Sequence, residues 1–365
     1  MGLFLLLQIY IITIGLLIYG FFKVKKYRKN NLDPQTSFTI IVPFRNEADN
    51  LPHLLTSFSK LNYPVDLWDV ILVDDESTEK FQISDFKFQI KIIDNVRVSK
   101  SPKKDAIATA MKHVKTDWVI TTDADCTVPE NWLLTFDNYI QENEVAMLAG
   151  PVTYDCDNSF LHHFQQLDLT SLQGATIGSF GIKKAFMCNG ANFAYKKSLF
   201  EKISGFEGNN AIASGDDVFL LQKVANLNQN LVHYLKAEEA IVHTKPTQDW
   251  ESLFYQRVRW AAKTSSYQSF FGKILGLIVF FANLSLVIGT VFLFFGIWSW
   301  QLLILFVGLK FIIDFGLLYS TNQFLTNKRI KYLVLSSLFY PFFSSAVALY
   351  SFFGSYNWKG RSFKV

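Results

Sequence analysis

Long apolar runs lie near both ends of this chain and limit its fold more than any other feature. The run from Leu3 to Phe22 contains no charged residue, and about 20 apolar residues suffice for a helix to cross the hydrocarbon core of a bilayer. Three more apolar runs follow between Gly272 and Gly354, whereas Lys23 to Lys263 has the mixed polarity of a soluble domain. We therefore expect an integral membrane protein with a soluble domain between its membrane spans.

Basic residues follow the first apolar run and indicate its orientation. The segment from Lys23 to Lys29 is rich in lysine and arginine, which the positive-inside rule assigns to the cytoplasmic side. A cleaved signal peptide is the alternative for the first run, but no small-residue cleavage site follows it. We expect an outside N-terminus and a cytosolic soluble domain, held at a bacterial plasma (inner) membrane.

Charge and cysteine content narrow the range of partners. The net charge is only +4 at pH 7, and attraction to anionic headgroups explains the basic segment. We therefore expect membrane lipids and no nucleic acid among the partners, and the sequence points to no particular protein partner. Cys126, Cys156 and Cys188 are odd in number and have no Cys-x-x-Cys spacing, which argues against a disulfide framework and a zinc site.

Short β-branched runs alternate with helical segments through the first half of the soluble domain. Phe38 to Val42 is typical of a strand covered on both faces, and a polar turn then leads into a predicted helix from Leu51 to Leu61. Three more predicted strands are Asp69 to Val73, Gln89 to Ile93 and Asp117 to Thr121. This alternation predicts an α/β fold with a mostly parallel sheet, in which ligands bind at the carboxyl ends of the strands.

Carboxylates gather at those predicted strand ends. Asp74 and Asp75 follow the second strand, and Asp123 and Asp125 follow the fourth. The i, i+2 spacing points the latter two side chains to the same side in extended backbone. Two carboxylates suit a hard divalent ion such as Mg²⁺ or Mn²⁺, which often also binds substrate phosphates. The alternative for both pairs is a polar turn or a helix cap.

Four segments in chain order carry a resemblance to a known family. They are Val42-Pro-Phe-Arg-Asn-Glu47, Val73-Asp-Asp-Glu-Ser77, Pro102-Lys-Lys-Asp-Ala106 and Thr122-Asp-Ala-Asp125. These segments resemble the ordered motifs of membrane-bound family 2 glycosyltransferases with a GT-A domain, similar to ceramide glucosyltransferase-like and polysaccharide synthase-like members. Asp-x-Asp alone is a weak signature, whereas four motifs on successive strands are specific.

The resemblance implies a nucleotide-sugar site at the carboxyl edge of the sheet. Its donor-binding residues would include Pro43, Arg45, Glu47, Asp74, Asp75, Lys103, Lys104 and Asp123. Among these, Asp75 is expected to contact the base or the ribose, and either Lys103 or Lys104 lies near the nucleotide. Asp123 and Asp125 would hold the Mg²⁺ or Mn²⁺ ion that bridges the two phosphates.

Two later segments complete the site that the resemblance implies. Asp216 and Asp217 precede a predicted helix, and a role as its N-cap would explain one of them. The resemblance implies that Asp217 is the general base. Asp216 stands where many relatives have Glu. The turn from Cys188 to Asn192 is either a plain turn or part of the acceptor pocket. In the second case Asn189 and Gly190 would contact the acceptor, because glycine lets backbone approach a ligand closely.

A basic, aromatic-rich helix is predicted from Asp249 onward. Its position just before an apolar run favours an interfacial anchor. It also matches the Gln-x-x-Arg-Trp motif of membrane-bound family members through Gln256, Arg259 and Trp260. The resemblance implies that these three residues close over the donor diphosphate, and that Trp260 also shapes the acceptor entrance. The two interpretations are compatible.

The last part of the chain contains three predicted spans: Ile274 to Phe295, Leu302 to Tyr319 and Leu333 to Phe353. Lys310 and Asp314 are spaced to pair on one helix face. A cytosolic loop from Lys328 to Lys331 would put the basic tail Trp358 to Arg361 outside, contrary to its charge. A re-entrant hairpin at Pro341 would return the tail to the cytosol, and both topologies stay open.

The expected domains are a transmembrane helix (1–22), a basic linker (23–37), a cytosolic GT-A domain (38–248), an interfacial helix (249–271), a transmembrane region (272–354) and a basic tail (355–365). The expected activity is an inverting, metal-dependent transfer of sugar from a nucleotide-sugar donor, a UDP-sugar, to a lipid or glycan acceptor at the membrane. The alternatives are a processive polysaccharide synthase and a non-catalytic nucleotide-sugar-binding scaffold.

Overall fold

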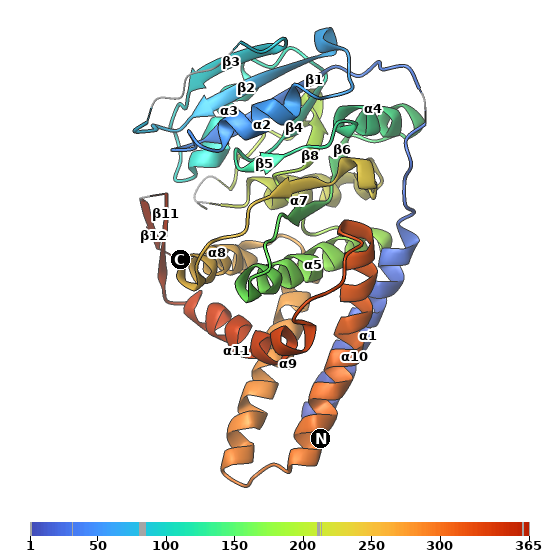
Figure 1. The fold of residues 1–365 in the computed structure, drawn as a ribbon, viewed down its shortest axis with the longest axis vertical. Helices are drawn as coiled ribbons and strands as arrows, with labels where there is room; N and C mark the ends of the chain where they lie inside the picture. The colour runs from blue at the N-terminus through green and yellow to red at the C-terminus, as the bar shows by residue number, and fades with distance from the viewer. Residues whose placement is uncertain are drawn as a thin grey trace. The chain divides into compact units, whose positions relative to one another are not determined.

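The computed structural model describes residues 2–30, 32–79, 85–209, 212, 214–359 and 361–364 (Figure 1). The chain forms two compact units. We call Lys25–Asp155 with Ala185–Lys245 the α/β unit, and Met1–Val24, Cys156–Lys184 and Pro246–Val365 the helical unit. Gly360, in the predicted basic tail, lies outside the described residues.

The α/β unit is built on one mixed sheet. Its strands, in spatial order, are β3 (Gln89–Asp94), β2 (Trp68–Asp74), β1 (Phe38–Phe44), β4 (Trp118–Thr121), β8 (Phe193–Lys196), β6 (Met147–Ala149) and β9 (Val232–Tyr234). Every pairing in this sheet is parallel except the two made by β8. The predicted α/β fold with a mostly parallel sheet is confirmed.

Five helices and three short 3₁₀ turns complete the described part of this unit. They are α2 (Leu51–Phe58), α3 (Pro102–Met111), α4 (Trp132–Glu142), α6 (Lys197–Lys202), α7 (Asp216–Asn228), η1 (Val65–Leu67), η2 (Gln229–Leu231) and η3 (Glu238–Ala240). Helix α3, which follows the third predicted strand, begins at Pro102. Proline fits the first turn of a helix, so both lysines of the third motif lie on α3.

One apolar run is divided between two sheets. The run from Val145 to Val152 gives β6 and then β7 (Val152–Tyr154), separated by Gly150 and Pro151. Strand β7 joins a small sheet in the order β5 (Cys126–Thr127), β10 (Val242–Thr244), β7. Proline lacks the N–H that a central strand needs, so the break falls at Pro151.

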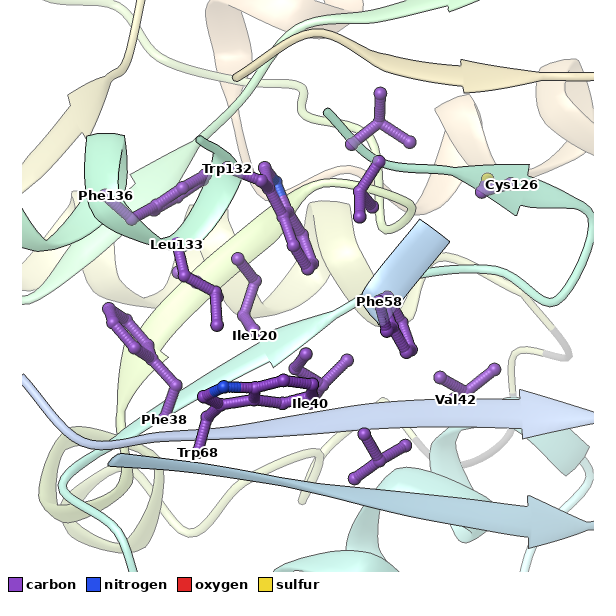
Figure 2. Close-up of a cluster of buried hydrophobic side chains, with 14 of the residues drawn as sticks. Phe38, Ile40, Val42, Phe58, Trp68, Ile120, Cys126, Trp132, Leu133 and Phe136 are labelled. Atoms are coloured by element: carbon purple, nitrogen blue, oxygen red, sulfur yellow. The ribbon is translucent and has the colours of Figure 1, made fainter. Parts of the chain in front are cut away.

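A compact aromatic core fixes the first strands of the sheet (Figure 2). Phe58 on α2 stacks on Trp132 on α4 with ring centroids 6.3 Å apart, and Trp68 on β2 meets the edge of Phe58. The indole N–H of Trp132 donates to Asn192 Oδ1 at 3.0 Å. Burial of these large rings is the main stabilising contribution, and it holds the strand ends in fixed positions.

The helical unit contains the long apolar helices. Its elements are α1 (Gly2–Lys23), α5 (Phe160–Gly181), α8 (Trp250–Ala262), η4 (Lys263–Ser266), α9 (Phe270–Phe294), α10 (Trp300–Leu325), α11 (Leu333–Tyr350), β11 (Ser355–Trp358) and β12 (Arg361–Lys364). By length and composition, α1, α9, α10 and α11 are each able to cross a membrane. Pro341 lies inside a continuous α11 and does not break it.

Polar side chains bind each other among these apolar helices. Lys310 Nζ lies 2.6 Å from Asp314 Oδ2, which confirms the predicted ion pair. The Tyr10 hydroxyl on α1 donates to Asp314 Oδ1 at 2.6 Å, so α1 also contributes to this pair. A paired charge costs less to bury among apolar helices than an isolated one, and the contact connects α1 to α10.

Helix α5 belongs to the helical unit, although its residues fall in the range expected for the GT-A domain. Gly178 and Gly181 of α5 pack directly on α1 backbone. A Cβ added to Gly178 would lie 2.4 Å from the Leu17 carbonyl oxygen, and one added to Gly20 would lie 2.1 Å from the Gly178 carbonyl oxygen. Such close approach needs glycine on both helices.

Candidate active site in the α/β unit

The loops after β1 and β2 are tied together at the carboxyl edge of the sheet. Arg45 Nη1 donates to the carbonyl oxygens of Asp75 and Glu76 at 2.6 and 2.7 Å. Pro43 lies within β1, and Glu47 Oε2 accepts a hydrogen bond from Asn50 at 2.6 Å. In this structure Arg45 therefore shapes the two loops that the sequence places around the nucleotide.

The two neighbouring carboxylates after β2 have different surroundings. Asp74 Oδ1 accepts the Ser77 N–H at 2.8 Å, which is the polar turn weighed as an alternative. Asp75 is buried, and its Oδ1 accepts from Asn95 Nδ2 at 2.6 Å and lies 3.5 Å from Arg97 Nη1. Sequence reasoning missed Asn95 and Arg97. The available signal was their position just after β3, at the same edge as the other motifs.

Lys103 brings three of the predicted segments together. Its ammonium on α3 lies 2.6 Å from Asp123 Oδ1, after β4, and 3.6 Å from Asp216 Oδ2, at the start of α7. Burial alone would lower the pKa of Lys103, but the carboxylates of Asp123, Asp216 and Asp217 outweigh it and raise that pKa above its ordinary value. Lys103 is therefore a permanent cation at the centre of an acidic cluster.

Lys104, the other candidate lysine, faces a different part of the unit. Its side chain is 1% exposed, and Nζ donates to the carbonyl oxygens of Asn209 and Ile212 at 2.8 and 3.0 Å. The ammonium also lies 4.9 Å from the centre of the Phe219 ring on α7. These contacts hold the segment that leads into α7, whereas the Lys103 ammonium lies within the acidic cluster.

Asp217 is held by backbone donors on both of its oxygens. The Gly190 N–H donates to Oδ2 at 2.8 Å, and the Val218 N–H donates to Oδ1 at 2.7 Å. A Cβ on Gly190 would lie 3.2 Å from both Asp216 Oδ2 and Lys103 Nζ. Glycine at this position therefore leaves room for the acidic cluster, and the predicted acceptor turn and the predicted base are in direct contact.

The turn before β8 is fixed by its two asparagines. Asn189 Oδ1 accepts the Ala191 N–H at 3.0 Å, which closes the turn locally. Asn192 is fully buried and donates to the carbonyl oxygens of Pro151 and Ala240 at 2.8 and 2.7 Å. The Thr121 hydroxyl at the end of β4 donates to the Gly190 carbonyl at 2.8 Å. The turn is thus bound to the strand that leads into the Asp-x-Asp motif.

The Asp-x-Asp pair has the donor chemistry of a hard divalent ion. The Asp123 side chain is 40% exposed and already attracts the Lys103 ammonium. Asp125 Oδ1 accepts from Cys126 Sγ at 3.8 Å, and burial, with Asp125 and Asp123 adding to it, raises the pKa of this thiol well above its ordinary value. Burial therefore favours the neutral form of this thiol.

Two carboxylates would fill only part of the coordination shell of Mg²⁺ or Mn²⁺ and would leave the other coordination positions for other ligands. Among the residues that the structure describes, no group of three or more His, Cys, Asp or Glu side chains is placed to hold a metal. Mg²⁺ and Mn²⁺ commonly take one or two carboxylates together with substrate phosphates and water. Asp123 and Asp125 fit that pattern.

The predicted Gln-x-x-Arg-Trp residues lie on α8 in the helical unit. Arg257, which sequence reasoning did not single out, organises them: its guanidinium lies 4.2 Å from the centre of the Trp260 ring and donates to Gln256 Oε1. Arg257 itself forms a buried ion pair with Asp168 on α5. The part of Gln256, Arg259 and Trp260 in donor and acceptor binding stays a prediction.

The mostly parallel sheet, with acidic loops at its carboxyl edge, is a mixed α/β fold of the GT-A type. A similar fold occurs in the mannosyltransferase PcManGT from Pyrobaculum calidifontis, solved in complex with GDP-Man and Mn²⁺: the TM-score is 0.51 at 17% identity, over 88% of this chain and 100% of that one.

Residues 39–204 match the family model described as glycosyl transferase family 2. The chain is also 25% identical over 250 residues to the probable glycosyltransferase YdaM of Bacillus subtilis (strain 168). That match covers 65% of this chain and 57% of the relative, so the chain spans little more than half of the length of that protein.

Proposed function

We propose that this chain is an inverting, metal-dependent glycosyltransferase that moves a sugar from a UDP-sugar to a membrane-associated lipid. The observation that supports the proposal most is the convergence at Lys103. The carboxylates of Asp123 and Asp216 lie 2.6 and 3.6 Å from its ammonium. The first belongs to the proposed metal pair and the second adjoins the proposed base, Asp217.

Each group of the cluster has a distinct role in the proposed donor complex. Asp75 contacts the base or the ribose, and Asp123 and Asp125 hold Mg²⁺ or Mn²⁺. The bound ion would offset the charge that develops on the departing diphosphate. Lys103 adds a fixed positive charge toward the same phosphates, because its three carboxylate neighbours keep it protonated.

Asp217 is the proposed general base. In the transfer step the acceptor hydroxyl oxygen bonds to the anomeric carbon, the bond from that carbon to the diphosphate oxygen breaks, and the hydroxyl proton moves to Asp217. Attack from the face opposite the leaving group inverts the configuration at that carbon. The two backbone N–H groups on Asp217 support this role, because they fix the direction of its carboxylate.

The test compares sugar transfer by membranes that contain the wild-type chain or the Asp217→Asn variant, with radiolabelled UDP-sugars as donors. Loss of a positioned general base should lower transfer at least about 100-fold. The matched control is Asp66→Asn, since Asp66 is an exposed carboxylate in η1 of the same unit. Equal transfer by wild type and Asp217→Asn would refute the assigned base.

The products of the same reaction distinguish single transfer from processive synthesis. The proposal predicts one added sugar on a lipid-extractable product. A ladder of long chains would instead identify a processive polysaccharide synthase. The chromatographic mobility of the labelled product before and after solvent extraction measures the difference.

A further inference from the structure

Three helices of the helical unit have charge at one end and exposed aromatic side chains at the other. Lys23 ends α1, and Lys273 lies in the first turn of α9. The link that follows α10 carries exposed Lys328, Arg329 and Lys331. The turn between α9 and α10 has no charged residue, and Phe294, Phe295 and Trp300 beside it are 85%, 76% and 58% exposed. Basic residues at one end and exposed aromatic residues at the other are typical of membrane spans. The basic ends of α1, α9 and α10 would then be cytosolic and the aromatic ends would lie outside.

Helix α11 runs in a different direction from those spans. Figure 1 shows it lying across α9 rather than alongside α9 and α10. It packs on α9, α8 and α5 within the helical unit. The Tyr340 hydroxyl near its middle donates to Asp168 Oδ1 on α5 at 3.0 Å. Helix α11 therefore contacts α5 and α8 as well as α9.

The polarity of α11 is the reverse of that of a helix on a water-soluble protein. Its buried positions include Ser336, Pro341 and Ser345. Its exposed positions are apolar: Val334, Leu335, Leu338, Phe339, Phe342 and Leu349 are 63%, 54%, 51%, 41%, 44% and 48% exposed. No residue from Leu333 to Tyr350 is charged. An exposed apolar face of this size needs an apolar environment.

Aromatic and basic residues surround this apolar face. Trp250 on α8, Tyr332 before α11 and Tyr350 at its end are 38%, 44% and 38% exposed, and Trp and Tyr concentrate where headgroups meet hydrocarbon. Basic residues precede α11 in the 328–331 link and follow it at Lys359 and Arg361. A spanning α11 would put these two groups on opposite sides of the membrane, against the positive-inside rule.

We propose that α11 lies flat in the cytosolic leaflet, with its apolar face toward the acyl chains and its flanking basic residues on anionic headgroups. The chain then spans the bilayer three times, through α1, α9 and α10. The hairpin of β11 and β12 returns to the side of α8, against which β11 packs. This inference does not depend on the proposed sugar transfer.

Cysteine accessibility tests the topology directly in the full chain. Cys126 and Cys188 are buried, so a Cys156→Ser background leaves little native reactivity. Single cysteines replace Asn327, Ser355 and Ile297, which are all exposed. A membrane-impermeant maleimide should label 327 and 355 only in inside-out vesicles, and 297 only in intact cells. Labelling of 355 from the same side as 297 would show that α11 spans and would overturn the proposal.

Fluorophore depth gives a second, independent measurement. Bimane is attached at cysteines that replace Leu335, Leu338 or Phe342, three exposed positions spread along half of α11. In vesicles of zwitterionic and anionic phospholipid, lipids that carry quenchers at different depths report the position of each probe. A flat helix predicts the same shallow depth at all three. A steady increase from 335 to 342 would contradict it.

Discussion

Lys103 is the residue on which the site depends most. Three carboxylates raise its pKa. The Lys104 ammonium instead donates to carbonyl oxygens before α7. Removing the charge would leave Asp123, Asp216 and Asp217 to repel one another and the donor phosphates. In the proposed donor complex the role of Lys103 is electrostatic, and loss of its charge should affect donor binding and transfer together.

We expect Lys103→Met to lower kcat/KM for the donor by about 100-fold or more, the usual effect of losing a preorganised charge. The control is Lys112→Met, because Lys112 is exposed at the end of the same helix, α3. Initial rates over a range of donor concentrations measure both variants. A Lys103→Met enzyme with wild-type kinetics would rule out a direct part for this ammonium.

At the residue scale, the sequence proposes the candidate site residues but not the partners of each side chain. Asp75, Asp123, Asp216 and Asp217 are candidates because the motifs that contain them resemble those of family 2 glycosyltransferases. The spacing of residues in the sequence does not predict whether Lys103 or Lys104 lies beside the carboxylates. It also does not predict that Asn95 binds Asp75. Both depend on the direction of α3 and of the β3 loop, which tertiary packing sets.

At the element scale, the first four strands are predictable because buried parallel strands are short β-branched runs. Helix α5 is not predictable as part of the helical unit, because its buried Gln165, Asp168 and Gln173 resemble a solvent-facing side in the sequence. Their partners come from distant segments: Thr247 binds Gln165, and Arg257 binds Asp168. The sequence of α5 alone therefore does not indicate that this helix belongs to the helical unit.

The contact between α1 and α5 gives a prediction about packing. Gly20→Leu places a side chain where the Gly178 carbonyl already lies, with a Cβ separation of 2.1 Å, and overpacking of this kind costs about 1–3 kcal/mol or more. Gly15→Leu on the same helix is the matched control, since nothing lies within 4 Å of a Cβ at that position. Thermal unfolding of the full chain in detergent should show a lower midpoint for Gly20→Leu only.

An equal midpoint for the two α1 variants would contradict the packing of α5 on α1. It would then be unclear why Gly20, Gly178 and Gly181 are glycine, because a Cβ on Gly181 would also lie 1.9 Å from the Gly20 carbonyl oxygen. The structure instead explains all three by one close helix contact.

At the scale of the whole molecule, two physical environments divide the chain into two units. The apolar helices and α5 form one, and the sheet with its acidic edge forms the other. Hydropathy predicts the spans because a bilayer requires long apolar helices. It does not distinguish a spanning helix from one that lies in the leaflet, because both are apolar, so the place of α11 depends on its packing and exposed face.

The central claim is that the acidic edge of the sheet transfers sugar from a nucleotide donor to a membrane lipid. The most direct measurement incubates the purified full chain with labelled nucleotide sugars, total lipid extract and Mn²⁺, and then counts label in the lipid phase. We predict that one donor labels lipid, that EDTA abolishes the reaction and that added Mn²⁺ restores it. Donor binding without any sugar transfer across the whole donor panel would contradict the claim and identify a nucleotide-sugar-binding scaffold.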